Sequence, residues 1–115
     1  MAINLAIRLA AEPLRSLAFG SISGTYAGIG TAFVNPCRIL LVQNLTDETM
    51  LFSFDGVNDH FVLPAEGFVL IDVESNKTTT GGALNIPVGT RIYAKDAGTP
   101  PTTGAVYVST FYGAS

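Results

Sequence analysis

The stretch CRILLVQNLTDETMLFSFDGVNDHFVLPAEGFVLIDV, residues 37–73, decides the fold. Short apolar runs alternate in it with turn-forming Asp, Asn, Gly, Pro and Thr, and no helical period extends over ten residues. Short apolar runs bounded by such residues are typical of β-strands. The stretch therefore predicts an all-β protein, with strands expected at 37–44, 50–54, 60–64 and 67–73.

The same pattern continues on both sides of this stretch. RSLAFGSI (15–22), TRIYAK (90–95) and AVYVSTFYG (105–113) read as further strands, and the polar segments 74–82 and 96–104 read as loops. The last run alternates, with Val106, Val108, Thr110 and Tyr112 on one face. A chain of 115 residues suits one domain. We predict a single small β-sandwich, jelly-roll-like or immunoglobulin-like, of about eight short strands.

The N-terminal stretch AINLAIRLA, residues 2–10, alternates apolar residues with Asn, Ala and Arg. Period two predicts an extended arm, residues 1–12, before a sandwich domain of residues 13–115. Such an arm either adds a strand to the sheet edge of a neighbouring subunit or pairs within its own sheet, and both alternatives stay open. A signal peptide would begin with basic residues, which this stretch lacks, and Arg8 interrupts the apolar run that a membrane span would need. We therefore expect an intracellular product without a membrane partner.

Charged side chains are scarce. They make up 13% of the chain, about half the usual share, against 48% hydrophobic residues and a net charge of −3. A surface this poor in charge favours a protein that covers part of its outside with other subunits, so we expect a homo-oligomer. The six basic residues are scattered, which disfavours nucleic-acid binding. A single cysteine, Cys37, excludes an internal disulfide and reads as a small buried hydrophobe.

The segment FSFDGVNDHFVLPA, residues 52–65, gathers Asp55, Asp59 and the one histidine, His60. A zinc site needs three or four His or Cys ligands, and a calcium loop needs closely alternating acids with a closing Glu. The segment has neither. Gly, Asp and Asn are the residues of a hairpin turn. We therefore predict a turn here and no metal site.

The sequence also predicts no catalytic residues and no cofactor. The carboxylate pairs Asp72/Glu74 and Asp47/Glu48 read as solvated strand ends, although paired acids can serve general acid catalysis. A serine nucleophile would need His60 as its base, and no Gly-x-Ser-x-Gly motif occurs. The glycine-rich GSISGTYAGIG lacks the Lys of a phosphate-binding loop. We do not expect an enzyme.

Most aromatic residues are expected at core-facing strand positions, Phe54 among them. Phe111 and Tyr112 lie on opposite faces near the end of the last strand, so one of them is expected to be exposed as an interface anchor. The candidate interface combines this pair with the apolar residues of the arm: Ile3, Leu5, Ile7, Leu9, Phe111 and Tyr112.

Several segments together resemble a family of small virion structural proteins of tailed bacteriophages. The resemblance covers about residues 13–113, and its most specific pieces are QNLTD (43–47), FSFDG (52–56), DHFVLP (59–64) and SNK (75–77). It implies a small β-sandwich subunit that joins the virion, assembled in the cytoplasm of the bacterial host, and catalyses nothing.

Two structural roles fit this resemblance. The first is a capsid decoration or cement protein that stabilises the shell, with the major capsid protein as partner. The second is a neck or head–tail adaptor subunit that forms a ring on portal or neck proteins. The absence of a long helical pattern favours decoration slightly. A third alternative is a receptor- or carbohydrate-binding sandwich of a fibre. The loops are rich in Thr, Gly, Pro and Ala, which argues against a strong ligand pocket and so disfavours this alternative.

Overall fold

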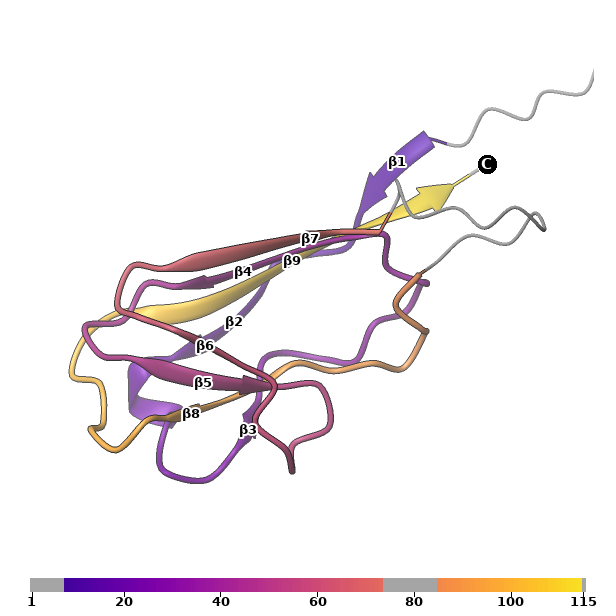
Figure 1. Cartoon of the computed structure of the whole chain (residues 1–115). Coiled ribbons are helices and arrows are strands. Elements are labelled where there is room, and N and C mark those ends of the chain that lie inside the picture. Colours follow the sequence, from indigo (N-terminus) through magenta and orange to yellow (C-terminus); the bar gives the residue numbers. More distant parts are fainter. Residues whose placement is uncertain (1–7, 74–84, 115) are drawn as a thin grey trace, which may run out of the picture.

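Two antiparallel sheets stacked face to face contain all nine strands of the described chain (Figure 1). The computed structural model describes residues 8–73 and 85–114. Its one helical element is a short 3₁₀ turn, η1 (Phe19–Ser21). The strands are β1 (Arg8–Ala11), β2 (Arg15–Ala18), β3 (Ala27–Gly28), β4 (Ile39–Asn44), β5 (Met50–Ser53), β6 (Phe61–Leu63), β7 (Phe68–Asp72), β8 (Tyr93–Asp96) and β9 (Ala105–Ala114).

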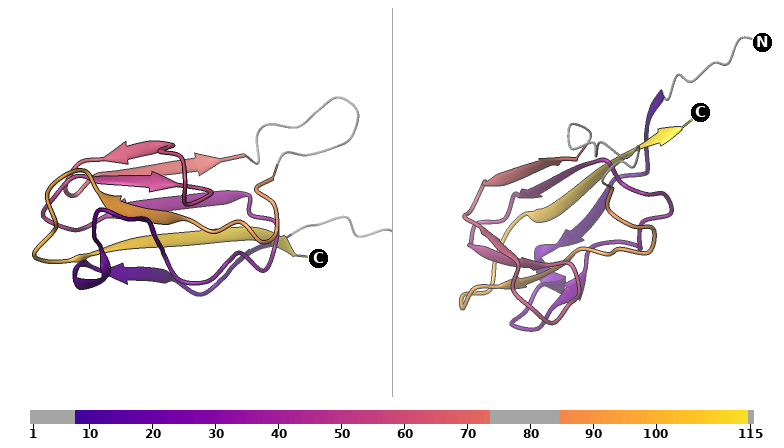
Figure 2. Two further views of the ribbon diagram at one scale, coloured as in Figure 1. Left: turned by 90° about the horizontal axis from the view of Figure 1, so that it is seen from below. Right: turned by 45° about the vertical axis from the view of Figure 1, so that its right-hand side comes forward.

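The larger sheet has the order β1-β9-β4-β7, and β2 also pairs with β9. One strand accepts both partners because β9 is ten residues long. β2 pairs with its first part, and β1 pairs with its last part, on the same edge. The smaller sheet has the order β3-β8-β5-β6. Most connections pass from one sheet to the other, and only β5 and β6 form a hairpin within one sheet (Figure 2).

The core lies between the two sheets and follows the strand alternation. β4 turns Leu40 and Val42 inward, and β9 turns Val106 and Val108 inward, all fully buried. Alternation of this kind places every second side chain in the core. The buried hydrophobic residues are Ile22, Ile29, Phe33, Cys37, Leu40, Val42, Met50, Phe52, Leu63, Ile92, Ala94, Val106 and Val108.

The predicted all-β sandwich is confirmed, as are the buried Cys37 and the alternation of side chains along β9. Residues 8–11 of the predicted arm are extended and form β1 within their own sheet. Arm residues 1–7 lie outside the described residues, and so does the whole of the first predicted loop, residues 74–82.

The expectation that most aromatic residues face the core is wrong. Among them only Phe33 and Phe52 are fully buried, whereas Phe54 is half-buried at the hairpin. Phe68 is 66% exposed because it begins an edge strand on the outer face of the larger sheet.

The segment QNLTD joins three loops at one end of the sandwich. The side chain of Asn44 is fully buried; its Nδ2 donates to the carbonyl oxygens of Glu48, Leu63 and Pro64, and its Oδ1 accepts from the N–H and hydroxyl of Thr46. The neighbouring Gly104 has φ +86°, and a Cβ there would lie 2.0 Å from the carbonyl oxygen of Leu45. This motif of the family resemblance thus has a structural role in the fold.

Candidate interaction surface

The outward-facing residues of β4, β7 and β9 form one continuous surface, here called the outer sheet face. Register places Leu41 between Leu70 and Ser109, Ile39 between Asp72 and Phe111, and Gln43 between Phe68 and Tyr107. Residues opposite each other across antiparallel strands share a face, so the three rows lie side by side. The outer sheet face therefore consists of Ile39, Leu41, Gln43, Phe68, Leu70, Asp72, Tyr107, Ser109 and Phe111.

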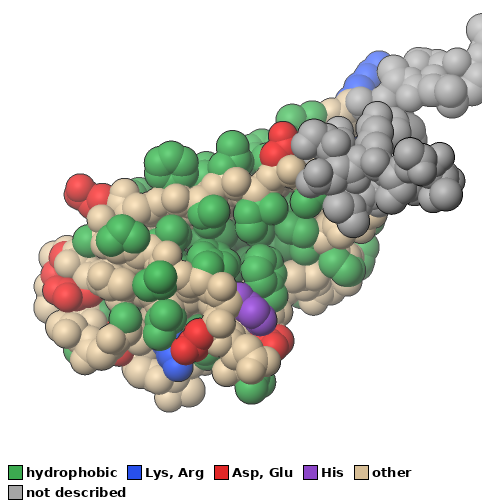
Figure 3. Space-filling view, viewed as in Figure 1, with side chains coloured by type: hydrophobic (Ala, Val, Ile, Leu, Met, Phe, Trp, Pro, Cys, Tyr) green, Lys and Arg blue, Asp and Glu red, His purple; other side chains and the backbone are tan. Residues whose placement is uncertain are grey.

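This face is apolar for most of its extent. Phe68 is 66% exposed and Leu70 is 57% exposed, and the half-buried Ile39 and Leu41 continue the apolar surface toward β9. In the space-filling view, hydrophobic side chains stand along the margin where β7 lies in Figure 1 (Figure 3). A scattered exposed Leu needs no explanation, but contiguous apolar side chains across three strands are a candidate contact surface.

The structure brings part of the predicted interface to this face. Leu9 is 59% exposed and pairs with Gly113, and Phe111 pairs with Ala11, so both side chains point to the same side as the outer sheet face. Tyr112 points the other way and lines a cleft. Ile3, Leu5 and Ile7 lie outside the described residues.

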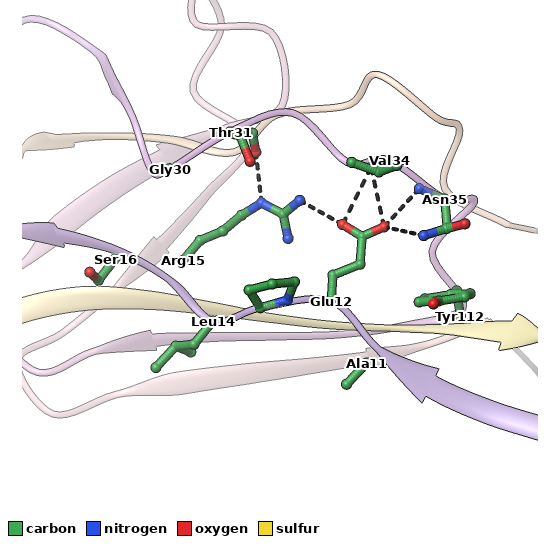
Figure 4. Close-up of a pocket in the computed structure, with 11 residues that line it drawn as sticks. Ala11, Glu12, Leu14, Arg15, Ser16, Gly30, Thr31, Val34, Asn35 and Tyr112 are labelled. Atoms are coloured by element: carbon green, nitrogen blue, oxygen red, sulfur yellow. Dashed lines mark hydrogen bonds and ion pairs between the residues drawn. The ribbon is translucent and has the colours of Figure 1, made fainter.

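That cleft has a volume of about 490 Å³ and lies between the β1–β2 corner and the loop after Gly30 (Figure 4). At its base Arg15 donates to Glu12 at 2.6 Å, to the carbonyl oxygens of Thr31 and Ala32, and to the hydroxyl of Thr110. The Arg15 guanidinium also stacks over Phe33, 5.0 Å from the ring centre. Both charged side chains are about 95% buried.

Glu12 holds the loop from the other side. Its carboxylate accepts from the backbone N–H groups of Val34 and Asn35 and from the Asn35 side-chain amide. Burial alone would raise the pKa of Glu12, but the hydrogen bonds from Arg15, Asn35 and the two N–H groups leave it below its ordinary value. The polar atoms of the pair thus fix the loop of residues 31–35 against β2, and Arg15 also bonds to Thr110 on β9.

Sequence reasoning did not identify this pair. The local signal was the Glu-Pro-Leu-Arg spacing, since Arg15 lies two residues before Leu17 on β2 and therefore on the same inward face. The partners that explain its burial come from residues 31–35 and 110, which no local pattern connects with residue 15.

The predicted turn at residues 55–59 is confirmed. Asp55 accepts from the N–H groups of Val57 and Asn58 and from the Ser53 hydroxyl, and these bonds hold its pKa well below the ordinary value. His60 accepts the N–H of Phe54 at its Nδ1. Asp59 accepts from the Tyr26 hydroxyl and lies 3.4 Å from Lys95. The three side chains that the sequence gathers here therefore serve the hairpin and its attachment to β8.

The other sequence candidates also have structural partners. Asp47 accepts from the N–H and hydroxyl of Thr102, which joins the loop before β5 to the loop before β9. Burial raises the pKa of the Cys37 thiol. Within residues 8–73 and 85–114 no group of three or more His, Cys, Asp or Glu side chains could hold a metal ion. In the same ranges, no helix is long and apolar enough to cross a membrane.

Comparison of the chain with protein-family models, with curated proteins and with solved structures found no match.

Proposed function

We propose that the chain is a non-enzymatic structural subunit of a tailed-phage virion that binds a neighbouring protein through the outer sheet face. The observation that carries the proposal is the run of apolar side chains across β7, β4 and β9, with Phe68 and Leu70 more than half exposed. The low share of charged residues and the resemblance to small virion proteins point the same way.

A protein partner suits this face better than a small molecule does. Small ligands bind in concave sites that cover most of their surface, whereas a strand face offers a flat area. Flat apolar patches with few charges at their centre are typical of protein interfaces. The charged side chains around the cleft and the hairpin, Glu12, Arg15 and Asp55, already form hydrogen bonds within the fold.

The preferred role is capsid decoration, with the major capsid protein as partner and the virion as location. The described residues contain strands and one three-residue helical turn, which supports a compact cement subunit more than a helical ring component. The alternative is a ring subunit at the neck, bound to portal or neck proteins.

The test is binding to purified empty capsids of the phage that encodes the chain, measured by co-sedimentation. We expect Phe68→Asp to weaken capsid binding at least about tenfold, because it places a charge in the apolar face. Val57→Asp is the matched control: Val57 is 78% exposed, but it lies on the hairpin of the other sheet.

Equal capsid binding by wild type and Phe68→Asp would contradict the proposed face. Absence of capsid binding, together with a six- or twelvefold particle in light scattering, would contradict decoration and favour the neck alternative.

A further inference from the structure

One imidazole closes the loop that connects β5 with β6, residues 54–60, here called the hairpin loop. The backbone N–H of His60 donates to the carbonyl oxygen of Phe52 at 2.9 Å. The ring of His60 also accepts, at Nδ1, the backbone N–H of Phe54 at 2.9 Å. His60 thus binds the strand on the other side of the hairpin loop twice, once through its backbone and once through its ring.

The second of these bonds selects one form of the ring. An imidazole nitrogen accepts a hydrogen bond only when it carries no proton. Nδ1 of His60 is therefore without a proton, and the single proton of the neutral ring lies on Nε2. Nε2 lies 4.0 Å from Oδ2 of Asp55. The closed hairpin loop thus contains neutral His60 as the Nε2–H tautomer.

Protonation of the ring is incompatible with this arrangement. Because Nε2 already carries a proton, the second proton goes to Nδ1, and Nδ1 becomes a donor. It then faces the N–H of Phe54, which is also a donor, and two donors at this distance cannot bond. The protonated ring has to leave its position, and the nearby Asp55 carboxylate supplies a counter-ion for it.

The neighbouring titratable groups do not change over the pH range in which histidine titrates, about pH 5 to 8. Backbone N–H groups of the hairpin loop lower the pKa of Asp55, and the Tyr26 hydroxyl lowers the pKa of Asp59. Burial and Asp59 raise the pKa of Tyr26. Lys95 on β8 forms an ion pair with Asp59. The two carboxylates stay ionised and the phenol stays neutral, so His60 is the group that switches.

The ring of Phe54 connects this bond with the surface of the smaller sheet. Its centre lies 5.6 Å from that of the His60 ring and 5.9 Å from that of Phe61, and Phe54 is half-buried against the core. When the imidazole leaves, Phe54 loses one of these two ring contacts together with the hydrogen bond that fixes its backbone. Its apolar ring then becomes more accessible.

We infer that His60 is a pH-sensitive latch: the neutral ring holds the hairpin loop closed on Phe54, and the protonated ring releases it. The change is local, because the pairing of β5 with β6 and the hydrogen bonds that Asp55 accepts from Val57 and Asn58 do not involve the imidazole. This property of the hairpin loop goes beyond the proposed virion role and does not depend on it.

The test is NMR spectroscopy of the full, ¹⁵N-labelled chain at about pH 8 and about pH 5. His60 is the one histidine of the chain, so its ring signals are unambiguous. At the higher pH we expect ring-nitrogen shifts of the Nε2–H tautomer and a scalar coupling across the hydrogen bond between the Phe54 nitrogen and Nδ1. At the lower pH we expect this coupling to vanish.

Hydrogen exchange of the Phe54 N–H is measured in the same samples and corrected for the pH dependence of the intrinsic exchange rate. We expect its protection to fall at least about threefold on acidification, as the loss of one hydrogen bond implies. His60→Asn is the matched control, because its Oδ1 replaces Nδ1 as acceptor and does not titrate. In this variant we expect equal protection at both pH values. His60→Ala lacks the acceptor, and we expect weak protection of Phe54 at both.

Three results would overturn the inference: an Nδ1–H tautomer at the higher pH, equal protection of the Phe54 N–H at both pH values in the wild type, or a His60→Asn variant that loses protection as the wild type does. If His60→Asn fails to fold, the tautomer and the coupling in the wild type decide the question. Capsid binding by Phe68→Asp is a separate measurement, so failure of the latch and failure of the virion role are distinguishable.

Discussion

Replacement of Asn44 by Ala tests whether the buried amide organises the loop end of the sandwich. The side chain is fully buried and connects β4 with the loop before β5 and with the end of β6. We expect Asn44→Ala to fold but to have a lower free energy of unfolding than the wild type.

The magnitude follows from the group left without a partner. The Thr46 N–H loses its acceptor at 3.0 Å. The Leu63 carbonyl loses the amide but stays opposite Met50 in the β5–β6 ladder. The Pro64 carbonyl keeps the N–H of Gly67, and the Glu48 carbonyl keeps the Thr46 hydroxyl. One unmet buried group costs about 1–3 kcal/mol, and this is the loss that we expect. A domain of this length has a total stability of roughly 6–17 kcal/mol.

The assay is urea unfolding followed by tyrosine fluorescence, since the chain contains four Tyr and no Trp. Gln43→Ala is the control, because Gln43 is the adjacent residue of β4 but points to the outer sheet face. We expect this control to stay within about 0.5 kcal/mol of the wild type, as surface changes usually do. A loss below about 1 kcal/mol in Asn44→Ala would refute the network as a source of stability.

Two further predictions concern the core and the buried ion pair. Phe52→Ala should lower the free energy of unfolding by about 3–5 kcal/mol in the same assay, because Phe52 is fully buried and stacked on Phe61. Phe54→Ala should lower it by only about 1–2 kcal/mol, because Phe54 is half-buried. Equal losses in the two variants would place Phe54 in the core. The folded-state pKa of Glu12 lies below 4.5, so its ionised form stabilises the fold above that pH, and this stabilisation is lost as the pH falls through the folded-state pKa. The urea-midpoint gap between wild type and Glu12→Gln should narrow from pH 7 to pH 3, and a constant gap would refute this role.

Much of the fold could be predicted because its signals are local. The alternation in β9 showed which of its residues share a face, and the Asp-Gly and Asn-Asp pairs indicated the hairpin. β3 was missed because a strand of two residues leaves no period to detect. The exposure of Phe68 was missed because its outward direction depends on which strands pair, and β7 proved to be an edge.

The candidate site was less predictable for the same reason. Leu9 and Phe111 were named from the chain ends, and pairing of β1 with β9 does bring them to one side. The larger part of the outer sheet face comes from β4 and β7, whose residues are about 30 positions apart in sequence. Only the register joins Leu41 to Leu70, and a register is a long-range property.

The sequence nevertheless contains one signal for that face, in β4 itself. In antiparallel sheets, strands with one face in solvent alternate apolar and polar residues, while strands covered on both faces are apolar throughout. β4 is Ile-Leu-Leu-Val-Gln-Asn, with Leu40 and Val42 inward and Ile39 and Leu41 outward. Its neighbour β7 repeats this composition with Val69 and Ile71 on the inner side and Phe68 and Leu70 on the outer side. These two adjacent strands are largely apolar on both faces, and among the described residues no further layer covers their outer face, which is consistent with the proposed protein partner.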